Sequence, residues 1–434
     1  MIENIEYRDD LRYKLVYSYD ASGETSLVRG VFFPKKTTEV SLILKFLNKE
    51  GFPFIIKGAS SGIVGSSVPI EKDKYFVISL EKMNKILDLD LKRKEVLVET
   101  GILNGELNKY LKKYRLMYPP DPASFEFSTI GGNIATNAGG LKTRFYGTTK
   151  DYVLGERIVL RDGTIISTGF LAEDYSNSFI EYLSFSSEGN LFVVTEALLK
   201  LEDLDDDGWY FLIYNSDLDT LIDNLILLLK EDLDIIMLEY IEKDIINLLI
   251  KYLGFPYTFL HNNYVLLLKV RDKNKVLQFI KELDIEKIFI PVNTKEREIL
   301  LNIRRSISPV LYYLGNYKIN EDISLPIRRL KDFLMFLDEN KKYFKIYTFG
   351  HAGDGNLHIN LMVDYNEYLN KKEIYESFLE DFFKKVIDYY GTLSGEHGIG
   401  RRKKRYYTIE HKKLHIELES IIKRSITDEI YRLY

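Results

Sequence analysis

The chain of 434 residues contains no cysteine, one tryptophan and only 10 prolines. The absence of cysteine excludes disulfides, thiolate metal sites, cysteine-ligated iron–sulfur clusters and cysteine nucleophiles. Any redox chemistry must therefore use a bound organic cofactor or a metal held by nitrogen and oxygen ligands.

Long apolar runs and an excess of one charge sign are also missing. Apolar runs such as residues 225–229 are far shorter than the roughly 20 residues that span a bilayer. The N-terminus is acidic and polar, unlike a secretory signal. A net charge of -5 lacks the basic excess of nucleic-acid-binding proteins. We expect a cytoplasmic protein without a transmembrane segment or nucleic-acid partner, the alternative being peripheral attachment to the inner face of the membrane. Richness in Lys, Glu, Ile and Tyr is typical of a thermophile.

The first half of the chain alternates short apolar runs with loops rich in glycine, serine and proline. The pattern predicts strands over 54–56, 75–78 and 96–98, and helices near 39–48 and 103–114. Residues 153–166 have the form of a β-hairpin, with Asp162-Gly163 as the turn.

An acidic, turn-forming stretch at residues 201–208 predicts a domain boundary, which divides the chain into 1–202 and 203–434. Beyond it, strands are expected over 209–214, 235–241, 264–270 and 288–292. Helices that end near 229, 253 and 283 follow the first three strands. This alternation predicts an α+β domain with an antiparallel sheet covered by helices.

Three segments rich in small residues have the composition of ligand-binding loops. Lys57-Gly58-Ala59-Ser60-Ser61-Gly62 follows an apolar strand, and its backbone N–H groups could form a nest for a phosphate; an ordinary turn is the alternative. A second loop, Thr129 to Gly140, suits a backbone pressed against a flat polar ligand. Ser187-Glu188-Gly189-Asn190 repeats the pattern.

Three of the six histidines lie in two glycine-flanked clusters. One is His351-Ala-Gly-Asp-Gly-Asn-Leu-His358, and the other is Gly395-Glu396-His397-Gly398. Two histidines with one carboxylate form a recurrent open site for a divalent metal. The clusters predict a metal-assisted active site with a spare histidine for proton transfer, whereas a turn with structural hydrogen bonds is the alternative.

These motifs resemble those of the FAD-linked 2-hydroxy-acid dehydrogenases in the vanillyl-alcohol-oxidase/p-cresol-methylhydroxylase (PCMH) superfamily. The nearest branch contains D-lactate dehydrogenases, D-2-hydroxyglutarate dehydrogenases and the FAD subunit of glycolate oxidase. The resemblance extends from about residue 33 to 406 and is carried by residues 119–122, 129–140, 146–149, 151–155 and 187–189. It implies a two-lobed PCMH-type FAD-binding domain and an α+β cap domain for the substrate. Residues from about 393 to 434 would pack back on the FAD domain.

The resemblance also implies how FAD is held. The loop 57–62 would wrap the pyrophosphate, the segment 120–139 would line the isoalloxazine and ribityl chain, and residues 188–194 would lie towards the adenine. The implied FAD-binding residues are Lys57, Gly58, Ala59, Ser60, Ser61, Gly62, Pro120, Asp121, Thr129, Gly131, Gly132, Asn133, Thr136, Ala138, Gly139, Glu188, Gly189, Val193 and Val194. Covalent flavin attachment in the family needs His or Cys, so non-covalent FAD is expected.

The sequence departs from the family pattern at several places. Lys57 replaces the usual arginine, Phe192 replaces a usual glycine, and Ser60, Ser66 and Ser67 replace small positions that are often Gly or Thr. Residues 426–434 lack the Asn-Pro-Gly-Lys ending that helps close over the flavin.

In the catalytic half, the resemblance assigns a role to each of eight residues. The implied metal ligands are His351, His358 and Glu396, with zinc or manganese as the metal, and His397 would be the catalytic base. The implied substrate-binding residues are Arg304, Ser308, Lys318 and Asn360. A planar guanidinium suits a substrate carboxylate because it can bind both oxygens.

The expected enzyme transfers a hydride from a D-2-hydroxy acid to FAD and releases the 2-oxo acid. D-Lactate is the first choice, with glycolate and D-2-hydroxyglutarate as alternatives. The electron acceptor would be a quinone, a cytochrome, an electron-transfer flavoprotein or a partner subunit, and the expected assembly is a homodimer. The rival hypotheses are a non-redox alkylglycerone-phosphate-synthase-like transferase and an accessory FAD subunit of a multi-subunit glycolate oxidase.

Overall fold

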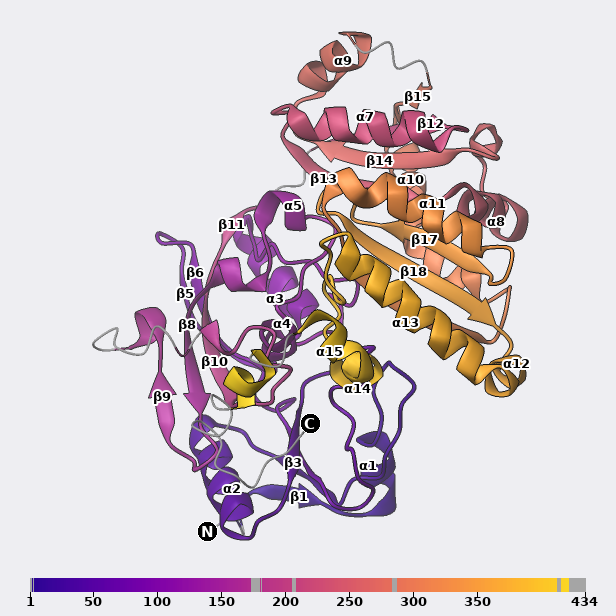
Figure 1. Cartoon of the computed structure of the whole chain (residues 1–434). Helices are drawn as coiled ribbons and strands as arrows, with labels where there is room; N and C mark the ends of the chain where they lie inside the picture. Colours follow the sequence, from indigo (N-terminus) through magenta and orange to yellow (C-terminus); the bar gives the residue numbers. More distant parts are fainter. Residues whose placement is uncertain are drawn as a thin grey trace. The chain divides into compact units, whose positions relative to one another are not determined.

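The structure is a computed structural model that describes residues 2, 4–172, 180, 182–204, 208–282, 287–411 and 415–420 (Figure 1). It divides into two compact units. The first comprises residues 1–140, 147–205 and 396–434, and the second comprises residues 141–146 and 206–395. The division near residue 205 lies three residues from the boundary expected at 202. Residues 141–146 belong to the second unit, which the sequence does not predict. The expected ending at 426–434 and the expected helix end at 283 lie outside the described residues.

One sheet of the first unit has the strand order β1-β2-β4-β3. Its strands are Glu6–Arg8, Gly30–Phe33, Phe76–Ser79 and Phe54–Lys57; β4 pairs in parallel with both β2 and β3. The helix α2 (Thr37–Lys49) follows β2 and buries Val40, Ile43, Leu44 and Leu47 against this sheet. The parallel pairing places the loop after Lys57 at the carboxyl end of β3, the usual position of ligand-binding loops.

The other large sheet of the first unit is antiparallel, in the order β5-β6-β10-β8-β9. Its strands are Ile86–Asp90, Glu95–Glu99, Val193–Lys200, Val153–Val159 and Ile165–Ser167. The predicted hairpin is confirmed, because β8 pairs with β9 around the turn at Asp162-Gly163. A two-stranded sheet pairs β7 (Leu116–Met117) with β11 (Glu202–Asp203). The helix α3 (Asn104–Leu111) lies within the range predicted for it.

The second unit contains a seven-stranded antiparallel sheet in the order β15-β12-β14-β13-β17-β18-β16. Its strands are Ile288–Phe289, Trp209–Asn215, Tyr264–Val270, Ile235–Ile241, Ile346–Gly350, Asn356–Val363 and Tyr317–Ser324. The predicted antiparallel sheet is confirmed, although β15 spans two residues instead of the expected five. Every residue of β13, β14 and β18 is buried, so both faces of the sheet are covered in its middle.

Helices cover this sheet in the alternation that the sequence predicts. The helices α7 (Leu218–Lys230), α8 (Lys243–Leu253) and α9 (Lys273–Glu282) follow β12, β13 and β14. The apolar stripe of α8 packs with α10 (Thr294–Leu311) against β14, where Leu249, Ile303, Ile307 and Leu267 share one core. Figure 1 also shows α11 (Leu330–Asn340) and α13 (Lys372–Asp388) beside the strands of this unit. No helix of the described residues is long and apolar enough to cross a membrane.

Candidate active site and flavin-binding loops

The loop after β3 presents unused backbone donors. The N–H groups of residues 59–62 donate no hydrogen bond to any described part of the chain. Ser60 has a φ of 55°, and its carbonyl is fixed by the N–H of Ala21 at 3.0 Å. Successive free N–H groups on a fixed backbone are able to bind the oxygens of a phosphate.

Lys57, at the end of β3, does not present its charge to this loop. The side chain is buried, and its Nζ donates to the carbonyl oxygen of Tyr19 at 2.7 Å. Burial lowers the pKa of Lys57 to about 8, and the nearby carboxylate of Asp20 opposes part of that shift. The contacts of Lys57 are therefore those of a residue that fixes the base of the loop.

The segment 129–140 contains a helix that sequence analysis does not predict. Ile130–Thr136 form α4, with Thr129 as the N-cap and Asn137 in the left-handed conformation as the C-cap. The prediction of a loop is wrong for these residues. The Thr129 side chain accepts from Gly132 N at 3.1 Å, and this N-cap hydrogen bond starts the helix. The Oγ of Ser128 and the Nδ2 of Asn133 are buried without a hydrogen-bond partner among the described residues. Such unsatisfied polar atoms fit a polar ligand beside α4.

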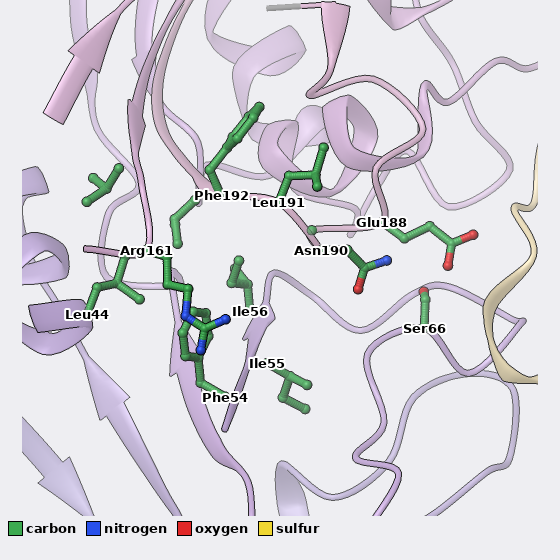
Figure 2. Close-up of a pocket in the computed structure, with 13 residues that line it drawn as sticks. Leu44, Phe54, Ile55, Ile56, Ser66, Arg161, Glu188, Asn190, Leu191 and Phe192 are labelled. Carbon is green, nitrogen blue, oxygen red and sulfur yellow. The ribbon is translucent and has the colours of Figure 1, made fainter. Parts of the chain in front are cut away.

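A pocket in the first unit is lined by residues of β3, of the helix α2, of the end of β8 and of the segment 188–193. Its walls combine apolar side chains with polar groups, and Figure 2 shows Arg161, Glu188 and Asn190 among them. The Arg161 guanidinium lies 5.8 Å from the ring centroid of Phe54. The full lining is Leu44, Phe54, Ile55, Ile56, Ser66, Val159, Arg161, Glu188, Gly189, Asn190, Leu191, Phe192 and Val193. Such a mixture of apolar and polar groups is typical of a small-molecule site.

Glu188 connects the helix α4 with the segment that follows His397. Its N–H donates to Ala135 O at 2.8 Å, and its carboxylate accepts from the N–H groups of Ile399 at 2.6 Å and Gly400 at 3.1 Å. Gly400 has a φ of +49°, and a Cβ there would meet Val64 O at 2.3 Å, so a side chain would be strained. Glu188 is expected from the sequence to contact FAD, and in the structure its carboxylate binds these two backbone N–H groups.

The basic run 401–405 also belongs to this arrangement. The guanidinium of Arg401 donates to Pro69 O at 3.1 Å, and that of Arg402 donates to Ser22 O. The N–H groups of both arginines donate to Val64 O. These arginines therefore fix the loop 62–69 rather than form a freely solvated patch.

In the second unit, three of the four predicted substrate-binding residues lie on or against the helix α10. Arg304 and Ser308 lie one turn apart on α10, and Lys318 Nζ donates to Ser308 Oγ at 2.6 Å. Burial lowers the pKa of Lys318. Asn360 on β18 is directly opposite Asn320 on β16, and their side chains are joined by a hydrogen bond of 2.7 Å.

The two histidines of the first cluster flank a tight turn between β17 and β18. Their ring centroids lie 5.2 Å apart, and both side chains are buried. Gly355 permits the turn, because its φ is +71° and a Cβ would meet Leu325 O at 2.0 Å. His358 is directly opposite Asp322 in the β16–β18 register, and opposed residues project from the same face of a sheet.

Sequence analysis did not single out Glu239, the carboxylate that binds His351. Glu239 lies on β13 and is fully buried. Its Oε1 lies 2.5 Å from His351 Nδ1, and its Oε2 accepts from Arg304 Nε at 2.5 Å. Burial by itself raises the pKa of Glu239, but the charges of His351 and Arg304 lower it further, to about 2. A single acidic residue within the apolar run 235–241 is the signal that could have identified it.

Glu396 and His397 follow Gly395, the last residue of the second unit. Gly395 packs so tightly that a Cβ there would meet Asn356 Nδ2 at 1.7 Å. This close packing fixes the backbone immediately before Glu396. His351 and His358 belong to the second unit, and Glu396 is the first residue of the last segment of the first unit. His397 Nε2 lies 3.6 Å from Glu396 Oε1. The donor set of two imidazoles and one carboxylate fits a divalent cation with open positions.

Comparison with known proteins identifies the family. Residues 28–169 match an FAD binding domain, and residues 210–426 match the C-terminal domain of FAD linked oxidases. The chain belongs to the FAD-linked oxidases. It is therefore an FAD-dependent oxidoreductase, and FAD is the ligand that the loops of the first unit fit.

Relatives in this family match nearly the whole chain. A glycolate oxidase subunit of Bacillus subtilis is 31% identical over 94% of this chain and 89% of its own length. A D-lactate dehydrogenase of Anaerostipes hadrus is 31% identical over 85% of this chain and 81% of its own length. A D-2-hydroxyglutarate dehydrogenase of Stutzerimonas stutzeri is 27% identical, with 91% and 87% covered.

Solved structures show the same fold at lower identity. A p-cresol methylhydroxylase with substrate bound gives a TM-score of 0.77 at 14% identity, and covers 97% of this chain and 91% of its own. An alkyldihydroxyacetonephosphate synthase gives a TM-score of 0.72 at 18% identity, with 97% and 80% covered. These likenesses confirm the expected PCMH-type architecture and α+β class.

The buried Lys57 predicts a pH-dependent stability. Its pKa is lowered from the ordinary 10.5 to about 8, so between these values the unfolded chain binds a proton that the folded chain does not. Stability due to this residue therefore rises with pH in that window, by about 1.4 kcal/mol per pH unit. The free energy of unfolding is measured for the parent and for Lys57→Met at pH 7, 8, 9 and 10. The parent's value minus that of Lys57→Met should increase above pH 8. Parallel pH profiles would contradict the shifted pKa.

The contacts of Glu188 predict that its loss frees the segment after His397. Hydrogen bonds to a charged acceptor contribute about 1.5–3 kcal/mol, so Glu188→Ala should raise amide exchange at Ile399 and Gly400 by roughly tenfold or more. Hydrogen exchange of the peptide that contains these amides measures the effect. Amides of α3, such as that of Leu107, serve as the internal control. Unchanged exchange at Ile399 and Gly400 would show that Glu188 does not hold this segment.

Proposed function

We propose that the chain is a dehydrogenase that uses FAD and a divalent metal to oxidise a D-2-hydroxy acid to the 2-oxo acid. The observation that carries this proposal is the polar cluster of the second unit. There, one carboxylate, that of Glu239, binds both the metal-ligand candidate His351 and the carboxylate-binding candidate Arg304. A site for an α-hydroxy carboxylate needs these two functions close together, because its hydroxyl and carboxylate are on adjacent carbons. The names of the relatives support D-lactate, glycolate and D-2-hydroxyglutarate as substrates.

Each residue of the cluster has a proposed role. Arg304 binds the substrate carboxylate through its terminal nitrogens, since Nε is already bound to Glu239. Ser308 and Lys318, joined by their own hydrogen bond, provide a second polar contact with the carboxylate. Asn360 contacts the substrate from β18, the strand that pairs with β16, on which Lys318 lies. The backbone N–H groups of residues 59–62 hold the pyrophosphate of FAD, which is bound non-covalently.

Proton transfer is assigned to His397. An imidazole is suited to act as a general base near neutral pH, and His397 Nε2 lies 3.6 Å from Glu396 Oε1. His351, His358 and Glu396 would hold zinc or manganese, which when bound supplies a Lewis acid for the substrate hydroxyl. FAD, when bound, supplies the acceptor for the hydride that leaves C2.

The electron acceptor and assembly follow from the same proposal. The reduced enzyme would pass electrons to a quinone, a cytochrome, an electron-transfer flavoprotein or a partner subunit. The relative named as a glycolate oxidase subunit supports a partner subunit. We place the enzyme in the cytoplasm, as a homodimer or within such a complex.

Anaerobic titration with hydroxy acids tests the reaction. Addition of D-lactate, glycolate or D-2-hydroxyglutarate to the purified yellow protein should bleach the flavin absorbance, and the L-acids should not. Removal of the metal with a chelator should abolish bleaching while FAD stays bound, and added zinc or manganese should restore it. If no acid bleaches the flavin, the dehydrogenase proposal fails and the transferase alternative is favoured.

Replacement of His397 tests the proton-transfer role. His397→Ala should bind FAD as the parent does but lose at least about a hundredfold in the rate of flavin reduction, the usual contribution of a general base. Stopped-flow absorbance measures this rate. His261→Ala is the matched control, because His261 is exposed, lies three residues before β14 and is outside the proposed site. Normal reduction in His397→Ala would contradict the assignment.

A further inference from the structure

The charged side chain of Glu239 lies where an apolar residue would be expected. It is the single acidic residue of β13, Ile235–Ile241, all of whose residues are buried. Isolated burial of a carboxylate costs several kcal/mol, and replacing a buried ionic group with apolar residues is often neutral or stabilising. Packing of this sheet alone therefore does not explain why an acidic residue stands at this position.

Both oxygens of Glu239 bind groups with a proposed role in the reaction. Oε1 lies 2.5 Å from His351 Nδ1, and Oε2 accepts from Arg304 Nε at 2.5 Å. A carboxylate on Nδ1 holds the proton there and leaves Nε2 as the ligand nitrogen. The bond to Nε likewise fixes the plane of the Arg304 guanidinium, which also lies 4.6 Å from the ring centroid of Phe349.

We propose that Glu239 is a positioning residue that orients His351 for metal binding and Arg304 for the substrate carboxylate. The inference rests on the proposed metal site and goes beyond it by naming a residue outside the ligand set. At the other histidine, the fully buried Asp322 is directly opposite His358 in the sheet.

Metal affinity provides a readout that does not depend on turnover. Metal-free holoprotein with FAD bound is titrated with Mn²⁺, and free Mn²⁺ is followed by electron paramagnetic resonance. Loss of a carboxylate that binds a ligating histidine typically weakens metal affinity by 10–100-fold. Glu239→Gln should show this loss, because the amide keeps the shape but cannot hold the Nδ1 proton as a carboxylate does. Glu239→Asp should retain the charge and recover part of the affinity.

Glu242 provides a matched control. It is a buried carboxylate just beyond the end of β13 that accepts from Thr348 N at 2.7 Å and pairs with Lys341. Glu242→Gln should lower the thermal midpoint by an amount similar to Glu239→Gln but keep Mn²⁺ affinity within twofold of the parent. An equal loss of affinity in both variants would identify a general loosening of the sheet and overturn the proposal.

A second readout concerns Arg304. Glu239→Gln should raise KM for the hydroxy acid at saturating metal, whereas Glu242→Gln should leave KM unchanged. Mn²⁺ affinity of Glu239→Gln within twofold of the parent would overturn the positioning role while the proposed function stands. If the parent itself binds no Mn²⁺ or Zn²⁺, the proposed metal site fails, and the role of Glu239 fails with it.

Discussion

Glu239 is fully buried, and its two oxygens have their partners only while His351 and Arg304 stay in place. Breaking a buried ion pair by removing one partner costs about 3–5 kcal/mol, so the three side chains constrain one another. They come from β13, the turn after β17 and the helix α10, which are distant in sequence. The register of the seven-stranded sheet and the packing of α10 on it therefore determine the geometry of the candidate site.

A different principle organises the loops of the first unit, where charged side chains bind backbone groups. The N–H groups of residues 59–62 have no partner in the described chain, and the rest of the loop is fixed by contacts to its carbonyls. The segment 399–402 supplies several of these contacts and is itself held by Glu188. Glu396 and His397 directly precede this segment. The part of the chain that carries the proposed base is therefore anchored, through residues 399–402, to the first unit.

Local sequence patterns predict much of this structure because they reflect local physics. Largely apolar runs give β12, β13 and β14, and Asp162-Gly163 gives the hairpin. The family resemblance predicts roles for the motif histidines and for Arg304 and Ser308, and helical spacing places that pair on one face of α10. The helix α4 was missed because its glycines are poor helix formers, whereas the Thr129 cap and tertiary packing stabilise it.

Glu239 shows why the remaining part of the site is harder to predict. No motif surrounds it, and its partners lie 65 and 112 residues further along the chain. A sequence pattern records which side of a strand is buried but not which buried cation lies opposite, because this depends on the order of strands in the sheet. The charge itself is nevertheless informative, since an acidic residue in a buried apolar strand is costly unless a cation neutralises it. A charge inside an apolar strand therefore predicts a buried partner, and in an enzyme that partner is a candidate for the active site.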